Sequence, residues 1–154
     1  MNEELIFQQM NFIRQITLYE MKHLLEDQAD QMPQGFSNTI RWNLGHIYTF
    51  QNMLLSQYGG KNIELPDGYT ELFAPKTKPV DWPSEVPTLA ELKQLLEQQP
   101  AIIQEALAGH LNETALKPFK SISTIGELLI FSMYHEGMHI GTIKALKKAT
   151  VVLK

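Results

Sequence analysis

Apolar residues recur near the helical period in the first part of the chain. Between Glu4 and about Asp27 they stand at Ile6, Met10, Ile13, Ile16, Met21 and Leu24. A second stripe with the same period follows at Ile40, Leu44, Ile47, Leu54 and Tyr58. Ser37 and Asn38 can cap the start of this second segment, and Gly59-Gly60 can end it. The pattern predicts two amphipathic α-helices.

A long segment without helical periodicity follows the second helix. Residues 61–87 contain the turn-forming pair Asp67-Gly68 and five prolines, at Pro66, Pro75, Pro79, Pro83 and Pro87. We expect an irregular connection long enough to run the full length of a helix bundle. Such a connection permits helices two and three to lie parallel, although a simple up-down order remains open.

Capping boxes mark the starts of two further helices. In Thr88-Leu-Ala-Glu91 and Thr124-Ile-Gly-Glu127 the hydroxyl and the carboxylate can each bond an orphan backbone N–H. We expect the third helix to kink or break at Pro100, because proline removes one helical hydrogen bond. The fourth helix continues to a cationic end at Lys144, Lys147 and Lys148.

Four amphipathic helices, with no alternating strand pattern and no internal repeat, predict an all-α fold. We expect a four-helix bundle with a long crossover loop between helices 2 and 3. The length of 154 residues fits a single domain, 1–154, that buries its core without disulfides or a structural metal. A metal in this chain would therefore serve function.

Charge and composition exclude several classes of protein. The net charge of −4 offers no basic field for nucleic acid. The N-terminus lacks the pattern of a signal peptide, and no apolar run is long enough to span a membrane. We therefore expect a cytoplasmic protein. The chain contains no cysteine, so a thiol could enter its chemistry only with a substrate.

The segment His135-Glu136-Gly137-Met138-His139 matches the H-E-x-x-H pattern of zinc proteases. Its context does not support a protease, because no Glu or His occurs in residues 140–154 and a third ligand must lie upstream. On a helix, however, two histidines four residues apart project from one face and can share a metal ion. Gly137 and Gly141 in the same helix serve close packing or access to the metal.

His46 is the best upstream candidate for the third ligand. It lies in the middle of the second helix, on a stripe that borders the apolar face, whereas His23 and His110 lie near helix ends and read as solvated or capping residues. Helix bundles build metal sites from side chains on facing helices. We therefore expect His46, His135 and His139 to form a three-histidine site.

Arg41-Trp-Asn-Leu-Gly-His46 and Tyr134-His-Glu-Gly-Met-His-Ile-Gly141 resemble the motifs of the DinB/YfiT-like family of bacterial metal-binding four-helix bundles. The resemblance spans essentially the whole chain. It implies that His46, His135 and His139 bind a divalent metal, and that the protein forms a homodimer. Family members often carry glutamine where this chain has Thr142. The metal ligands are unaffected by this difference.

Three neutral imidazoles leave a bound zinc, nickel or iron ion with its full charge and with open positions, as in catalytic sites. The ion could activate a water, or the thiol of a small cosubstrate as in the S-transferases that the family resemblance implies. Glu136 is a candidate proton acceptor, with a solvated surface glutamate as the equal alternative. Asn43 could orient His46 or bind substrate, or simply pack between helices. Arg41 and Trp42 could line an entrance for an anionic or aromatic substrate.

These observations lead to one main hypothesis and two alternatives. The main hypothesis is a metal-dependent enzyme acting on a small-molecule substrate, with no nucleic-acid or membrane partner. The first alternative is a non-catalytic bundle that binds metal or dimerises in a stress response. The second is a helical bundle whose histidines merely pack.

Overall fold

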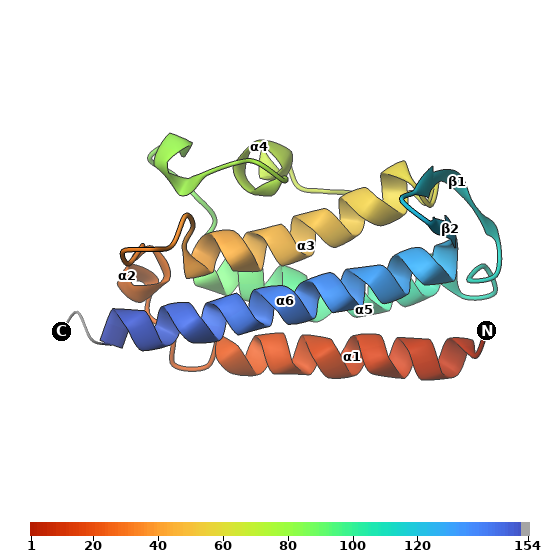
Figure 1. Ribbon diagram of the computed structural model, residues 1–154, viewed down its shortest axis with the longest axis horizontal. Coiled ribbons are helices and arrows are strands. Elements are labelled where there is room, and N and C mark those ends of the chain that lie inside the picture. Colours follow the sequence, from red (N-terminus) through yellow and green to blue (C-terminus); the bar gives the residue numbers. More distant parts are fainter. Residues whose placement is uncertain (152–154) are drawn as a thin grey trace.

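Four long helices make up most of the computed structural model, which describes residues 1–151 (Figure 1). They are α1 (Glu3–Glu20), α3 (Ile40–Gln57), α5 (Leu89–Leu107) and α6 (Ile125–Val151). Helix α6 packs against α3 and α1, and α5 packs against the same two helices. The prediction of a helical fold is confirmed. No helix within the described residues is long and apolar enough to cross a membrane.

Helices α3 and α5 run in one direction, and α1 and α6 run in the other (Figure 1). The connection from α3 to α5 returns along α3 and carries a short helix, α4 (Tyr69–Phe73), and a 3-10 turn, η1 (Pro79–Asp81). The connection is therefore long, as expected, but two short helical segments interrupt its irregular course. Tyr69 and Phe73 of α4 are buried, and α4 packs on α3. The burial of these two side chains holds the segment against α3, although its proline content alone would predict a loop.

The first helix ends earlier than its apolar pattern indicated. It stops at Glu20, and His23 then adopts the left-handed conformation, with φ of 63°. A separate short helix, α2 (Glu26–Ala29), follows. Met21 and Leu24 still pack in the core, so the spacing of apolar residues does not reveal the break. The N-cap of the second predicted helix is Thr39 rather than Ser37 or Asn38, and its hydroxyl accepts a hydrogen bond from the backbone of Trp42.

Helix α5 continues through Pro100, so the break that we considered there as an alternative to a kink does not occur. Proline at this position cannot donate to the carbonyl of Leu96, four residues earlier. That carbonyl instead accepts a hydrogen bond of 2.8 Å from Nη1 of Arg14 in α1. The guanidinium of a neighbouring helix thus satisfies the backbone group that the proline leaves without a partner.

A short antiparallel hairpin precedes α6, in a region where the sequence indicated no strand. Its strands are β1 (Thr114–Phe119) and β2 (Ile122–Thr124). Only Ala115 of β1 is buried, and β2 has three residues, so neither strand shows the alternation of apolar and polar residues that identifies a half-buried strand. The capping box Thr124–Glu127 follows at once and begins α6, as predicted.

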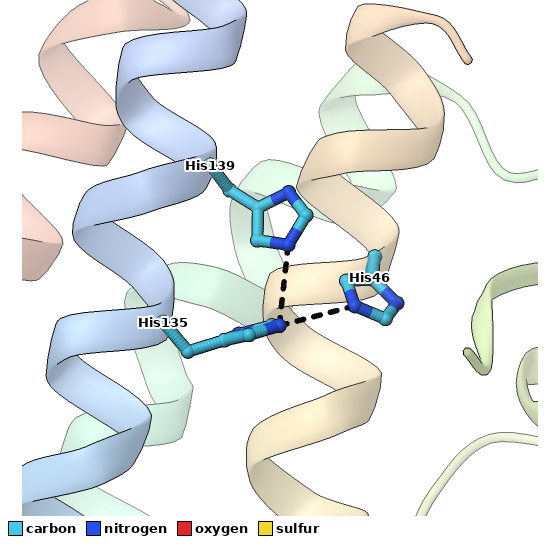
Figure 2. Close-up of side chains that lie close together, drawn as sticks. All are labelled: His46, His135 and His139. Carbon is cyan, nitrogen blue, oxygen red and sulfur yellow. Dashed lines mark hydrogen bonds between the residues drawn. The ribbon is translucent and has the colours of Figure 1, made fainter. Parts of the chain in front are cut away.

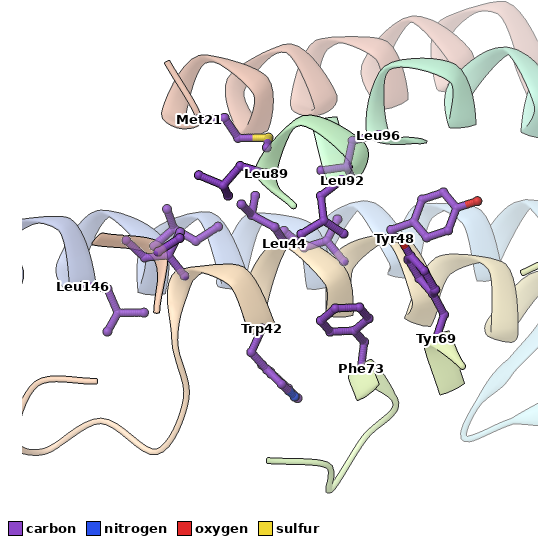
Figure 3. Packing of buried hydrophobic residues seen from close by; sticks show 14 residues of the cluster. Met21, Trp42, Leu44, Tyr48, Tyr69, Phe73, Leu89, Leu92, Leu96 and Leu146 are labelled. Carbon is purple, nitrogen blue, oxygen red and sulfur yellow. The ribbon is translucent and has the colours of Figure 1, made fainter. Parts of the chain in front are cut away.

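The apolar core consists of two clusters separated by a polar layer. One cluster, drawn in Figure 3, contains Leu44, Phe73, Leu92 and Leu146, and the other contains Met10, Leu54 and Ile103. Between them along the helices lies Arg14, only 1% exposed, whose guanidinium bonds the carboxylate of Glu136 at 2.8 and 3.1 Å. The same guanidinium reaches Gln51 of α3, and with Leu96 this layer joins all four long helices.

Candidate metal centre

The three histidines identified in the sequence meet between α3 and α6 (Figure 2). Nε2 of His135 lies 3.2 Å from Nε2 of His46 and 3.2 Å from Nε2 of His139. One ligand atom from each ring lies within 4.8 Å of the other two. Tetrahedral coordination with bonds of about 2.0–2.1 Å places two ligating nitrogens about 3.3 Å apart. Both 3.2 Å spacings therefore fit ligation of a single metal ion.

Hydrogen bonds on the far side of two rings determine which nitrogen of each ring faces the centre. Nδ1 of His46 donates to the carbonyl of Phe73 at 2.6 Å. Nδ1 of His139 donates to Oδ1 of Asn43 at 2.7 Å. With the proton on Nδ1, each ring presents the lone pair of Nε2 to the centre. Metal-ligating histidines are oriented in the same way in known sites.

Aromatic rings border the histidines. Trp42 stacks on His46, with 4.4 Å between ring centroids and 13° between planes. Phe50 stacks on His135, with 3.9 Å between centroids and 26° between planes. These contacts hold the imidazole planes in place and keep water from two sides of the centre.

Burial keeps the imidazoles neutral. Loss of hydration lowers the pKa of His135 to about 3, and repulsion from charged His139 and His46 adds to this effect. Burial, together with His46, lowers the pKa of His139 to about 4. The pKa of His46 is also lowered by burial, although its bond to the carbonyl of Phe73 acts in the other direction. At neutral pH all three rings are therefore available as neutral ligands.

No carboxylate joins this group, which is the only candidate set of metal ligands among the described residues. Three imidazoles suit zinc, nickel, iron and other first-row ions, and they add no negative charge to neutralise the ion. A three-nitrogen set is also one ligand short of the closed tetrahedral shell of structural zinc sites. The residues present thus fit a divalent transition metal with an open position.

Glu136 follows a candidate ligand in the chain, but its carboxylate belongs to the buried polar layer. Its oxygens accept hydrogen bonds from Arg14 and from Thr17, whose hydroxyl lies 2.6 Å from Oε1. Both partners are in α1, whereas His135 and His139 face α3. The glutamate is only 1% exposed, so it is not the solvated surface residue considered as the alternative.

The three residues expected to bind substrate occupy different surroundings. Arg41 is buried in ion pairs with Asp30 and Glu26, with the shorter contacts at 2.7 and 2.6 Å. Its charge is therefore neutralised within the protein, and the bond to Asp30 raises its pKa above the ordinary value. Trp42 lies beside the histidines and donates through Nε1 to Thr77 at 2.9 Å. Asn43 is fully buried, and its amide oxygen accepts a hydrogen bond from His139 rather than from His46.

Sequence reasoning missed one contributor to the site and gave no role to another. Phe73 acts through its backbone carbonyl, which no side-chain pattern can reveal. Phe50 lies one helical turn after His46, and the spacing placed it on the same stripe without indicating that its ring stacks on His135. The other histidines lie outside the site, as expected: His23 is exposed in a turn, and His110 bonds Glu113.

Comparison with known proteins supports a family assignment. A crystal structure of a conserved protein from Enterococcus faecalis resembles the chain with a TM-score of 0.63 over 97% of each chain, at 11% sequence identity. At this identity the likeness concerns the fold. No curated protein matches the chain. The sequence pattern of the DinB superfamily matches residues 9–143, which include all three histidines. The chain therefore belongs to the DinB superfamily.

Proposed function

We propose that the protein is a metal-dependent enzyme in which His46, His135 and His139 hold a divalent transition metal such as zinc, nickel or iron. The observation that carries this proposal is the convergence of three Nε2 atoms, with Nδ1 of His46 and of His139 engaged by hydrogen bonds. Two histidines that merely packed in a core would not need a third imidazole at 3.2 Å. The lowered pKa values favour the neutral, ligating form.

A divalent ion bound here supplies Lewis acidity that lowers the pKa of a water or of a thiol brought by a cosubstrate. The absence of cysteine from the chain fits a thiol that arrives with a small molecule, in a transferase-like reaction. Asn43 and the Phe73 carbonyl orient two imidazoles, and the rings of Trp42 and Phe50 limit the access of water. Of the two residues expected to line a substrate entrance, Trp42 remains in the proposal because its ring lies beside the histidines, and Arg41 does not because its charge is paired with Asp30 and Glu26. The candidate proton acceptor Glu136 is also left out, because its carboxylate is paired with Arg14.

The alternative function is a metal-binding module without catalysis. Both functions use the same three ligands, so metal binding cannot separate them. An enzyme turns over at least one member of a panel of small thiols with electrophiles or of hydrolysable substrates. A non-catalytic module binds metal and shows no turnover with any of them.

Elemental analysis of the purified protein tests the metal site. We expect about one divalent metal per chain, and a folded but metal-free protein when His46, His135 and His139 are all replaced by alanine. The matched control replaces His23 and His110, which lie outside the site, and should keep its metal. Metal retained by the triple variant would exclude this site, and its absence from fresh wild-type protein would favour histidines that only pack.

We further propose that the fold is a four-helix bundle with a crossover connection, and that it forms a homodimer. The ring of contacts among α1, α3, α5 and α6 and the parallel course of α3 and α5 support the bundle (Figure 1). Exposed apolar side chains at helical spacing support the dimer: Leu5, Phe12 and Tyr19 on α1, and Ile130, Tyr134 and Met138 on α6. Light scattering of wild-type protein and of the Phe12→Glu variant tests the dimer.

A further inference from the structure

A small cavity lies beside the candidate metal centre, at the end of α3 that faces the hairpin. It has a volume of about 150 Å³ and is lined by Phe50, Met53, Leu54, Gln57, Tyr58, Pro75 and Phe119. All of these residues except Gln57 present largely apolar side chains. An apolar cavity of about this volume binds benzene when engineered into another protein. The cavity is therefore large enough for one six-membered ring.

One aromatic residue connects the cavity to the histidines. Phe50 lines the cavity, and its ring also stacks on His135 at 3.9 Å and lies 5.6 Å from the ring of His46. A molecule bound in the cavity would be a single side chain away from the candidate ligands. This position is suitable for the apolar part of a substrate whose reactive group reaches the centre.

The hairpin supplies one wall of the cavity and two positive charges near it. Phe119 of β1 packs edge-on against Tyr58, with 4.9 Å between ring centroids. Nζ of Lys117 lies 4.8 Å from the centre of the Tyr58 ring. Nζ of Lys120, in the turn of the hairpin, lies 5.7 Å from the centre of the Phe119 ring. Figure 1 shows the hairpin beside the end of α3 and the start of α6.

The two lysines are available to an anion. Both are exposed, and neither forms an ion pair with a carboxylate within residues 1–151. The chain has a net charge of −4. The two lysines nevertheless place positive charges near two rings that line the cavity. An apolar cavity with cationic groups close to two of its lining rings is complementary to an organic anion that carries a ring.

We propose that this cavity binds the ring of a small aromatic anion, such as an aryl carboxylate, and that Lys117 and Lys120 hold the anionic group. The inference rests on the proposed function in one respect, because it takes the cavity to be the substrate-binding pocket next to the metal centre. The substrate class would then be a molecule with an apolar ring and a negatively charged end. Binding itself requires only the cavity and the hairpin.

Calorimetric titration of the metal-free full-length protein with three matched probes tests the proposal. The probes are 3-phenylpropionate, 3-phenylpropan-1-ol and 3-phenylpropylamine, which share a ring and differ in charge. We expect the anion to bind about tenfold more tightly than the amine, with the alcohol between them, because the two lysines favour negative charge. Equal affinity for anion and amine, or no binding of any probe, would overturn the proposal.

Two variants assign binding to this cavity. Gln57→Trp places an indole at an exposed helical position on the lining and should weaken binding of the anion at least tenfold, because the added ring fills the cavity. The matched control Gln104→Trp adds an indole at an exposed position of α5 outside the lining and should leave affinity unchanged. Unchanged affinity in Gln57→Trp would place the binding site elsewhere.

A charge-reversal variant tests the role of the hairpin. In Lys117→Glu/Lys120→Glu the amine should bind more tightly than the anion, whereas the control Lys22→Glu/Lys148→Glu, of equal net charge, should keep the wild-type preference.

The triple histidine variant separates this inference from the proposed function. It should lose metal and still bind 3-phenylpropionate. If wild-type protein binds metal but none of the probes, only the proposal for the cavity is contradicted. If it binds the probe but no metal, only the proposal of a metal-dependent enzyme is contradicted.

Discussion

The side-chain oxygen of Asn43 in α3 lies 2.7 Å from Nδ1 of His139 in α6. The amide nitrogen of Asn43 donates to the carbonyl of Thr39 at 2.7 Å and to Oδ1 of Asn38 at 3.0 Å. These bonds direct the amide oxygen towards the histidine, which must then carry its proton on Nδ1. Asn43 thus orients a candidate ligand on the opposite helix, and no substrate needs to contact it.

Replacing Asn43 with alanine should weaken metal binding by about 10- to 100-fold, because His139 loses the acceptor that sets its tautomer and ring orientation. Competition titration with a zinc chelator measures the affinity, and circular dichroism establishes that the variant is folded. The control Asn11→Ala removes an amide that bonds only the backbone of its own helix at Phe7. Equal zinc affinity in Asn43→Ala and wild-type protein would show that this bond does not support the site.

Glu136→Gln should destabilise the protein by about 3–5 kcal/mol, because it leaves the buried charge of Arg14 without its partner. Urea unfolding measures this loss. The control Glu97→Gln disrupts an exposed pair with Lys93 and should change stability by at most about 0.5 kcal/mol. Folded Glu136→Gln protein should keep its metal. A variant with wild-type stability but no activity would instead indicate a chemical role for the glutamate.

The metal-free protein should lose stability as the pH falls below about 6.5, in part through its histidines. The pKa values of about 3 for His135 and about 4 for His139 lie below that of the unfolded chain, so the unfolded chain binds protons first. Their contribution is complete above about pH 6.5 and is lost as the pH falls through the folded pKa values. Each histidine adds a slope of at most about 1.4 kcal/mol per pH unit in this interval.

Urea unfolding of chelator-treated protein across this pH interval measures that slope. The variant His135→Asn/His139→Asn removes both titrating groups and should show a shallower dependence on pH. The carboxylates of the protein titrate in both proteins, so the difference between the two curves isolates the histidines. Identical slopes would contradict the lowered pKa values.

Gly45→Ala should destabilise the protein by about 1–3 kcal/mol and also weaken metal binding. A Cβ at Gly45 would overlap the ring of Phe73, which is fully buried and cannot move freely. Displacing Phe73 would disturb its carbonyl, the acceptor for His46. The control Gly141→Ala meets no neighbouring atom and should stabilise the protein by about 0.5–1 kcal/mol. Thermal unfolding and zinc titration measure both effects. A tolerated alanine at Gly45 would contradict the close approach of α4.

Local signals in the sequence determined the long helices and the three histidines. Capping boxes at Thr88 and Thr124 begin two helices, because these hydrogen bonds form between residues three apart. The spacing of His135 and His139 places both on one face of α6 for the same reason. The open space around Gly141 excludes tight packing as its role, which sequence spacing alone had left undecided.

Tertiary contacts decided the features that depend on distant partners. Helix α5 tolerates Pro100 because Arg14, in another helix, donates a hydrogen bond to the carbonyl of Leu96, which the proline leaves without a helical partner. The position of His46 opposite His135 depends on the packing of α3 against α6, and its tautomer depends on a carbonyl 27 residues away in α4. Sequence alone therefore determined which residues could bind a metal, because ligand type and helical spacing are local. Only the tertiary structure decided how those ligands are oriented and what surrounds them, because hydrogen bonds and packing between separate helices set both.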